Sequence, residues 1–303
     1  MNPMIFALPG NELLAEALVE AMRAQRGTIA MRHFPDEETY LRVEQPVNGR
    51  DVLIAATLDR PNSKLVDLYL LASTLREGGA RRIVLVAPYL PYMRQDRSFS
   101  AGEGVSAAHI ARWLSSFLDG LVTVEPHLHR IRALEQVYRM PVRTVHVPEA
   151  IGRWVRENVT QPLLIGPDEE SGSWVAGAAA IAACKYLVLK KLRHGDRDVS
   201  IVVPGVQQFP EHTPVLLDDI ISSGATLVEA AHKLKAVGAP PPVCVAVHAI
   251  FAQEAYERLQ HAGVDRIVTC NTILHPSNAI DVHREIALAA ADLLASVDRG
   301  VAA

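Results

Sequence analysis

The chain has few cysteines, no long apolar run and no strong excess of charge of either sign. Cys184, Cys244 and Cys270 are the only cysteines among 303 residues, and they are isolated and without the spacing of metal ligands. This pattern indicates reduced core residues in a cytoplasmic protein. With a net charge of −4, the chain lacks the excess of positive charge that is typical of proteins that bind nucleic acid. Gly, Pro, Asp and Glu interrupt every apolar segment, so we expect no signal peptide and no membrane-spanning helix.

What the chain does contain is an alternation of short apolar runs with helical patterns. Its length suggests about two domains, and a hydrophobic content of 49% is ordinary for a globular protein. The alternation predicts an α/β fold with mainly parallel sheets flanked by helices, and residues 147–151 are a plausible crossover between two halves. Predicted strands are 4–8, 52–56, 83–87, 121–124, 162–165, 186–189, 199–203 and 243–249, and predicted helices are 11–26, 63–75, 106–118 and 172–183.

One strand–turn–helix pattern, at residues 215–227, carries most of the chemical information. An apolar run ends in Asp218 and Asp219, and a turn rich in Ser, Gly and Ala leads into a helical pattern. Amides and hydroxyls at a helix start bind phosphate, helped by the helix dipole. The two carboxylates lie where open α/β sheets bind ligands, and they can accept hydrogen bonds from a vicinal diol. The pattern therefore suits a ribose 5-phosphate; the alternative is an acidic strand end before a capped helix.

A second occurrence of this pattern in the chain predicts two similar domains. Residues 52–63 repeat the order of apolar strand, turn and helix seen at 215–226. Ala55 and Ala56 stand where the second copy has its acidic pair, so we expect the sugar site in the second copy alone. The alternative is a chance likeness between two ordinary α/β units. The expected boundaries are 1–146 for the N-terminal domain, 147–290 for the C-terminal domain and 291–303 for a tail.

A loop after the strand at 83–87 presents a polar cluster, Arg94, Gln95, Asp96 and Arg97. The planar guanidinium group of arginine can donate two parallel hydrogen bonds to the oxygens of a polyphosphate. Charged residues in a loop are otherwise often a solvated turn, and it is the combination with the acidic pair at 218–219 that favours a binding role.

An early loop, His33–Tyr40, mixes an aromatic ring with carboxylates. Phe34 can stack on a base, and Asp36 and Glu38 can accept hydrogen bonds from an amine or from ribose hydroxyls. Taken alone, the same residues would describe a surface turn.

Two further strand ends offer ligands for a divalent cation. A strand at 122–124 runs into His127, and the strand at 162–165 delivers Asp168 at a sharp turn before a helix. Magnesium prefers oxygen ligands and usually keeps water, so Asp168 suits either this ion or a sugar hydroxyl. His127 at a strand end is alternatively a structural histidine.

With these residues in place, the chain from about Met4 to Ala290 resembles the ribose-phosphate pyrophosphokinase family. Phe99–Glu103, Ser222 and Cys270–Ile273 resemble its archaeal-type branch. The resemblance implies two phosphoribosyltransferase-like domains and transfer of the ATP diphosphoryl group to the C1 hydroxyl of ribose 5-phosphate. Glu169 and Glu170 add acidic charge where many members have small residues, which would affect nucleotide and metal binding.

The resemblance also implies roles for individual residues. Phe34, Asp36 and Glu38 would bind ATP from a neighbouring subunit, which requires at least a homodimer, and Mg²⁺ would be the metal cofactor. Lys191 and Arg193 would start a flexible catalytic loop, where positioned cations stabilise a transferring phosphoryl group. The remaining implied sites are ATP at Arg94, Gln95 and Asp96, metal at His127 and Asp168, ribose hydroxyls at Asp218 and Asp219, and the 5-phosphate at Ser222, Ser223, Gly224, Ala225 and Thr226.

Two other functions compete with this one. A phosphoribosyltransferase acting on a base would share the pattern at 215–227, but it has no reason to carry the Arg94–Arg97 and Phe34–Glu38 clusters or a doubled domain. A non-catalytic regulatory homologue would bind nucleotide alone, and the presence of Lys191 with both aspartates argues against it.

Overall fold

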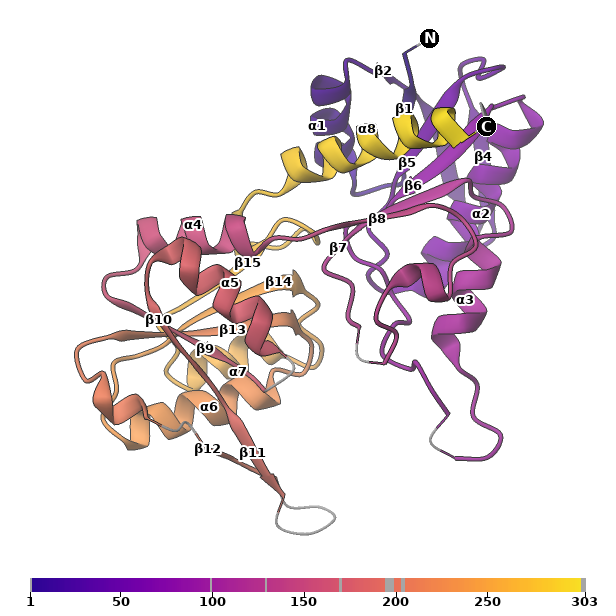
Figure 1. The fold of residues 1–303 in the computed structure, drawn as a ribbon. Coiled ribbons are helices and arrows are strands. Elements are labelled where there is room, and N and C mark those ends of the chain that lie inside the picture. Colours follow the sequence, from indigo (N-terminus) through magenta and orange to yellow (C-terminus); the bar gives the residue numbers. More distant parts are fainter. Residues whose placement is uncertain are drawn as a thin grey trace. The chain divides into compact units, whose positions relative to one another are not determined.

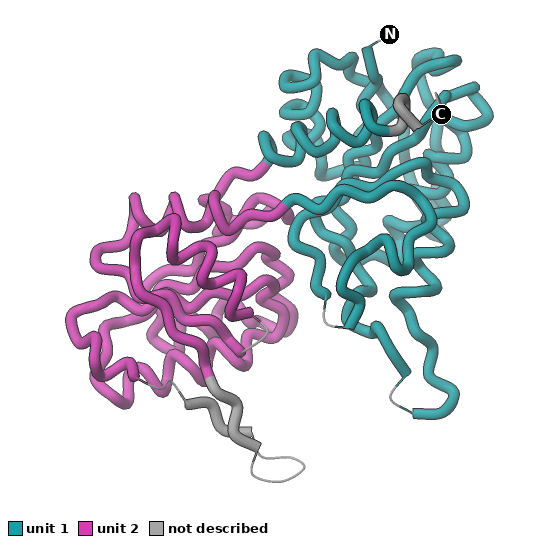
Figure 2. Tube along the Cα trace, in the orientation of Figure 1, with its two compact units in different colours: residues 1–145, 283–303 teal, residues 146–282 magenta. Residues whose placement is uncertain are grey.

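The computed structural model divides the chain into two compact units (Figure 2). It describes residues 2–98, 100–128, 130–168, 171–193, 199–202 and 205–300, with the backbone alone for 190–193, 199–202 and 297–300. Unit 1 is Met1–Val145 together with His283–Ala303, and unit 2 is His146–Val282.

The centre of unit 1 is a sheet of six parallel strands in the order β2-β1-β5-β6-β7-β8 (Figure 1). Its strands are β1 (Met4–Ala7), β2 (Gln25–Arg26), β5 (Asp51–Ala55), β6 (Arg82–Val86), β7 (Gly120–Val124) and β8 (Val142–Val145). The strands β1, β5, β6 and β7 are buried along their whole length. Helices cover both faces of such a sheet, which explains why its strands are apolar runs rather than alternating patterns.

Four helices flank this sheet, namely α1 (Glu12–Met22), α2 (Pro61–Glu77), α3 (Ser106–Leu114) and α8 (His283–Gly300). Apolar residues of α2 and α3 share one core with one face of the sheet. On the other face, α1 packs against α8, and Leu293 of α8 lies over Gly120. The helix predicted at 11–26 ends at Met22, because Arg23 is left-handed with φ 49° and Gln25–Arg26 pair with β1 instead. No helix in the described part of the chain combines the length and apolar character that a bilayer crossing needs.

A hairpin of β3 (Ile29–His33) and β4 (Thr39–Val43) is inserted between β2 and β5. Its Ile29, Met31, Leu41 and Val43 side chains pack on the unit 1 core. Residues 34–38, expected in an early loop, form the tip of this hairpin.

Unit 2 is built in the same way around parallel strands in the order β10-β9-β13-β14-β15-β16 (Figure 1). Its strands are β9 (Pro162–Gly166), β10 (Lys185–Val188), β13 (Thr213–Ile221), β14 (Val243–Ala249), β15 (Arg266–Cys270) and β16 (Asn278–Ile280). Its helices are α4 (Pro148–Asn158), α5 (Gly172–Ala182), α6 (Ala225–Ala236) and α7 (Ala255–His261). The expected crossover at 147–151 is the beginning of α4. The three cysteines are free thiols, and Cys244 and Cys270 are buried.

The two sheets are copies of one another. Counted within its own unit, each has the strand order 2-1-3-4-5-6, and each has a hairpin between its second and third strands. In unit 2 this hairpin is β11 (Lys190–Arg193) with β12 (Val199–Val202). The segments 52–63 and 215–226 follow the same topology, since β5 and β13 are both third strands. The predicted fold class, two duplicated α/β domains, is confirmed.

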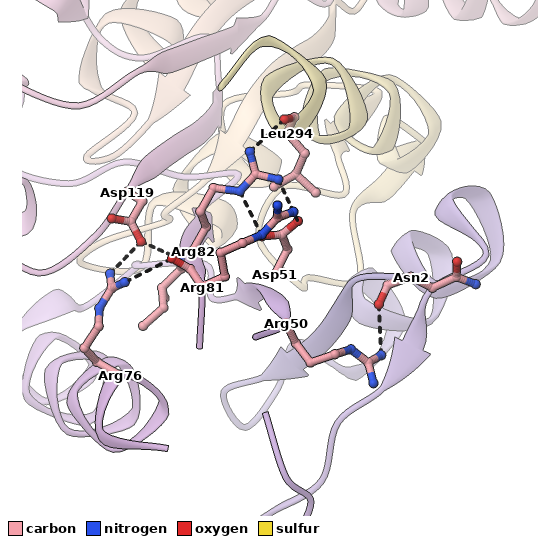
Figure 3. A network of polar contacts seen from close by, with 9 residues as sticks. Asn2, Arg50, Asp51, Arg76, Arg81, Arg82, Asp119 and Leu294 are labelled. Atoms are coloured by element: carbon pink, nitrogen blue, oxygen red, sulfur yellow. Dashed lines mark hydrogen bonds and ion pairs between the residues drawn. The ribbon is translucent and has the colours of Figure 1, made fainter. Parts of the chain in front are cut away.

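The C-terminal helix lies in unit 1, which differs from the expected boundaries. The expected boundaries place residues 283–290 in the second domain and 291–303 in a tail, whereas α8 packs on the first sheet. Arg82 joins the helix to β5, because its Nη1 donates to the Leu294 carbonyl at 3.0 Å and its Nε to Asp51 Oδ1 at 2.8 Å (Figure 3). Burial raises the pKa of Asp51, but the hydrogen bonds and charges of Arg82 and Arg81 outweigh this and lower it to about 2.

Candidate active site

The tip of the β3–β4 hairpin holds Phe34, Asp36 and Glu38, three of the six residues predicted to bind ATP. Its turn is closed by the Phe34 N–H, which donates to the Glu38 carbonyl at 2.8 Å, while Glu38 N–H lies 3.4 Å from Asp36 Oδ1. Phe34 is 40% exposed. The structure therefore brings an accessible ring and two carboxylates together on one turn.

Two residues that the sequence analysis missed accompany Phe34 on the hairpin. The Arg32 guanidinium lies 4.5 Å from the centre of the Phe34 ring and 4.7 Å from that of Tyr40. The Thr39 hydroxyl, beside the tip, donates to Asp67 Oδ1 of α2 at 2.6 Å. Arg32 and Tyr40 are directly opposite one another in the hairpin, so their side chains lie on the same face.

The loop after β6 carries Arg94, Gln95 and Asp96. Gln95 holds the start of α3, because its Oε1 accepts from the Ser106 hydroxyl at 3.1 Å and its carbonyl from the Ala107 N–H at 3.2 Å. Asp96 accepts from the Arg130 N–H at 2.9 Å, and its side chain is nearly inaccessible. Arg94 is exposed. Gln95 and Asp96 thus fix the loop, and the guanidinium of Arg94 is at its surface.

His127 follows β7 at the carboxyl edge of the unit 1 sheet. Glu125, two residues before His127, has φ 31°, and its N–H donates to the Val145 carbonyl at 3.1 Å. The chain therefore turns sharply before His127, whose side chain is partly buried. The loops after β6 and β7 both start at the edge where parallel sheets bind ligands.

Asp168 follows β9 and is held by a local hydrogen-bond ring. Its Oδ1 accepts from the Ser171 N–H at 3.1 Å, and its carbonyl accepts from the Ser171 hydroxyl at 2.6 Å. A serine three residues after an aspartate is a usual signal for such a turn. The side chain is partly buried.

Asp218 and Asp219 lie on β13, which pairs with β9 in the sheet. The Asp219 N–H donates to Asp218 Oδ1 at 2.9 Å. Burial, then the Asp219 carboxylate and finally that of Asp168, raise the pKa of Asp218 well above its usual value. The three aspartates thus form one acidic cluster that favours hydroxyl donors or a cation.

The sequence predicts that the strand ends at the acidic pair, but β13 continues to Ile221. The turn is therefore Ser222–Gly224, with Gly224 left-handed at φ 68°, and α6 starts at Ala225. The first N–H groups of a helix have no partner within it. In α6 the Gly224 carbonyl accepts from the N–H of Val228, so the N–H groups between these two residues are the ones without a partner inside the helix. The helix start consequently presents N–H donors just after the strand that carries the two carboxylates.

Lys191 and Arg193 lie on β11, where they pair with Ile201 and Val199. Their backbone is described, whereas their side chains lie outside the described part of the structure. Glu169 and Glu170 also lie outside the described residues.

Among the described residues, no three His, Cys, Asp or Glu side chains come together closely enough to hold a metal ion alone. Magnesium does not require such a group, because it usually takes one or two carboxylates together with substrate phosphates and water. Asp168, Asp218 and Asp219 are not such a group of three, but one or two of their carboxylates could serve, and a divalent charge would offset the repulsion that raises the pKa of Asp218.

The fold and the site define a protein built from two phosphoribosyltransferase-type domains. The family model of the phosphoribosyl transferase domain matches residues 133–286. The model of the N-terminal domain of ribose phosphate pyrophosphokinase matches residues 3–117.

Whole-chain relatives define the family more narrowly. The ribose-phosphate pyrophosphokinase of Sulfolobus acidocaldarius is 31% identical over 274 residues, covering 88% of this chain and 92% of that protein. The one of Methanopyrus kandleri is 31% identical over 282 residues, covering 92% and 96%. Phosphoribosylpyrophosphate synthetase from Mycobacterium smegmatis has the same fold, with a TM-score of 0.82, 21% identity and coverage of 99% and 100%. The chain belongs to the ribose-phosphate pyrophosphokinase family.

Proposed function

We propose that this chain transfers the β,γ-diphosphoryl group of ATP to the C1 hydroxyl of ribose 5-phosphate, giving phosphoribosyl pyrophosphate and AMP. Family membership supports the proposal. The observation that carries it is the acidic pair, Asp218 and Asp219, on the strand that leads into the turn before α6. A carboxylate pair beside an anion-binding helix start suits a pentose 5-phosphate.

The acceptor is assigned to unit 2. The N–H groups and hydroxyls of Ser222–Thr226 bind the 5-phosphate, with the positive end of the α6 dipole behind them. Asp218 and Asp219 accept hydrogen bonds from the 2- and 3-hydroxyls. This arrangement leaves the C1 hydroxyl without a carboxylate partner and available to the donor.

The donor is assigned to Phe34, Asp36 and Glu38 of a second copy and to the loop at Arg94. The exposed Phe34 ring stacks on adenine, and the carboxylates accept from its amine and from ribose hydroxyls. Arg94 binds phosphate oxygens, while Gln95 and Asp96 hold its loop through Ser106, Ala107 and Arg130.

In the reaction, the C1 oxygen forms a bond to the β-phosphorus. The bond from that phosphorus to the oxygen bridging to the α-phosphorus breaks, AMP leaves, and the hydroxyl proton is released. Lys191 and Arg193 supply positive charge to the transferring group, which is where such reactions gain most from positioned cations.

Magnesium is the proposed cofactor, with His127 a candidate ligand of one ion and Asp168 a candidate ligand of a second ion or of the ribose. When bound, it neutralises charge on the phosphate oxygens. The acidic cluster around Asp168 supports its assignment.

One assay tests the proposal. The protein is incubated with Mg²⁺, ribose 5-phosphate and ATP labelled at the β-phosphorus, and the products are separated. We expect equal amounts of AMP and labelled phosphoribosyl pyrophosphate. A regulatory homologue would give no AMP with any pentose phosphate, and a phosphoribosyltransferase would instead consume phosphoribosyl pyrophosphate when a base is added.

A homo-oligomer follows from the shared donor site. If the Phe34–Glu38 turn completes a neighbour's site, a single chain is incomplete. Light scattering should therefore give a mass of at least two chains, and a mass of one chain would contradict the assignment. Mixing inactive Phe34→Ala and Lys191→Ala proteins should restore activity, because some sites then receive both intact elements.

A further inference from the structure

Three consecutive carbonyls before α6 are all hydrogen-bonded to one neighbouring segment, residues 251–258. The Ile221 carbonyl accepts from the Phe251 N–H at 2.8 Å, and the Ser222 carbonyl from the Ala252 N–H at 3.0 Å. The Ser223 carbonyl accepts from Nη2 of Arg258, an exposed side chain on α7.

These bonds fix the direction of the N–H groups in the turn. A trans peptide is planar, so the N–H of one residue points away from the carbonyl of the residue before it. Carbonyls held toward segment 251–258 therefore direct the N–H groups of Ser222, Ser223 and Gly224 to the opposite side. Successive N–H groups aimed to one side form an anion-binding concavity.

The backbone of segment 251–258 is itself strained. Phe251, Gln253 and Glu254 are left-handed, with φ of 42°, 55° and 58°. Non-glycine residues in this region persist only when their surroundings hold them there, and such strain gathers at functional sites. Here the strained residues turn the N–H groups of Phe251 and Ala252 toward the carbonyls of β13 and the turn.

We propose that segment 251–258 is a template for the phosphate-binding turn, and that Arg258 is a positioning residue for the 5-phosphate. This inference rests on the proposed function for the identity of the anion. Arg258 acts through the Ser223 carbonyl, on the side of the peptide opposite to the N–H groups that bind phosphate. Its role is to hold the Ser223–Gly224 peptide in the orientation that the anion requires.

The test compares Arg258→Ala with Arg258→Lys, which keeps a donor, and with Arg266→Ala as the matched control. Arg266 also donates to a carbonyl of unit 2, that of Asn158 at 2.9 Å, but at the start of β15. We expect Arg258→Ala to raise KM for ribose 5-phosphate about tenfold, with kcat and KM for ATP within about twofold, since one hydrogen bond is lost. Arg258→Lys should restore most of the affinity, and Arg266→Ala should leave it unchanged.

Amide hydrogen exchange of residues 222–227 in the substrate-free protein separates positioning from direct contact. Arg258→Ala should speed this exchange about tenfold, because the turn loses a bond that holds it closed. A raised KM with unchanged exchange would overturn the proposal in favour of direct phosphate contact, and an unchanged KM would overturn it outright. If the wild-type protein forms no AMP, the proposed function fails, while the exchange and the affinity for inorganic phosphate still decide the role of Arg258.

Discussion

The turns that follow the third strand of each sheet are copies, yet the N–H groups of their peptides are used differently. In unit 2 the carbonyls of the turn are bonded and the N–H groups are directed away from them. In unit 1 two N–H groups of the turn are themselves bonded: Thr57 N–H donates to Asn11 Oδ1 at 2.7 Å and Leu58 N–H to the Tyr89 carbonyl at 3.3 Å. The Thr57 carbonyl also accepts a hydrogen bond, from Lys64 Nζ at 3.1 Å. Pro61, at the start of α2, has no N–H at all.

The side chains of the two turns differ in the same direction. Both helices have a left-handed residue as cap, Arg60 with φ 49° and Gly224 with φ 68°. Counted back from these caps, Ile54 and Ala55 stand opposite the acidic pair of unit 2. The sequence comparison pairs the acidic residues with Ala55 and Ala56, which lie one position later. Neither pairing gives unit 1 a carboxylate. Duplication therefore preserved the backbone but not the groups that recognise a sugar phosphate.

The comparison is tested most severely by removing the acidic pair. Replacing Asp218 and Asp219 together by Asn should lower kcat/KM for ribose 5-phosphate by about a hundredfold or more, because two carboxyl groups are replaced by amides, which accept more weakly and bring an NH₂ donor toward the sugar hydroxyls. KM for ATP should change little. Steady-state kinetics with each substrate varied in turn provide the measurement.

The matched control lies in the other copy. Asp59 of the unit 1 turn pairs with Lys64, and Asp59→Asn should leave KM for ribose 5-phosphate within about twofold, because this partly buried pair belongs to the copy that lacks the acceptor site. An equal loss from Asp59→Asn would show that both turns serve the acceptor and would break the comparison.

Much of this difference could be predicted from the sequence. The apolar runs of β5 and β13 are continuous because both faces are covered, and the Ser-Gly-Ala turn at 222–225 signals a helix start after a strand. The absence of carboxylates at Ala55 and Ala56 is a matter of residue identity. Such local signals need no knowledge of distant partners.

The features that escaped prediction depend on contacts between remote parts of the chain. The strands of the β3–β4 hairpin mix polar and apolar residues, and their pairing depends on register across a turn. The Ser223 carbonyl meets Arg258 35 residues later. Arg82 meets the Leu294 carbonyl 212 residues away, so a helix that follows the second copy in sequence folds onto the first.

That helix is the basis of the next prediction, since α8 distinguishes unit 1 from unit 2. Asp51→Asn should lower the free energy of unfolding at pH 7 by about 2 kcal/mol, because Arg82 and Arg81 lose their carboxylate. The folded pKa of about 2 lies below the ordinary 3.8. The stabilisation is therefore complete above about pH 5 and disappears as the pH falls toward 2, with a loss of about 1 to 2 kcal/mol.

Denaturant unfolding of the wild type and Asp51→Asn between pH 7 and pH 3 measures this effect as a difference between the two proteins. The difference in free energy of unfolding between the two proteins should be constant from pH 7 to about 5 and should become smaller below pH 4. Asp292→Asn is the control, because its ion pair with Arg143 is exposed and should contribute under about 1 kcal/mol. A gap that widened on acidification would contradict the assigned direction of the pKa.

The smallest expected effect concerns the two helix caps and has opposite signs in the two copies. Gly224→Ala places a Cβ on a left-handed residue, which costs about 1 kcal/mol, and the strain falls on the turn that binds phosphate. Thermal stability should drop slightly, and KM for ribose 5-phosphate should rise about fivefold. Arg60→Gly removes the same kind of strain from unit 1, so it should stabilise the protein by up to about 1 kcal/mol and leave both KM values unchanged. If Arg60→Gly altered KM for ribose 5-phosphate, the turn of unit 1 would have kept a role in the acceptor site, and the two copies would differ less than their hydrogen bonds indicate.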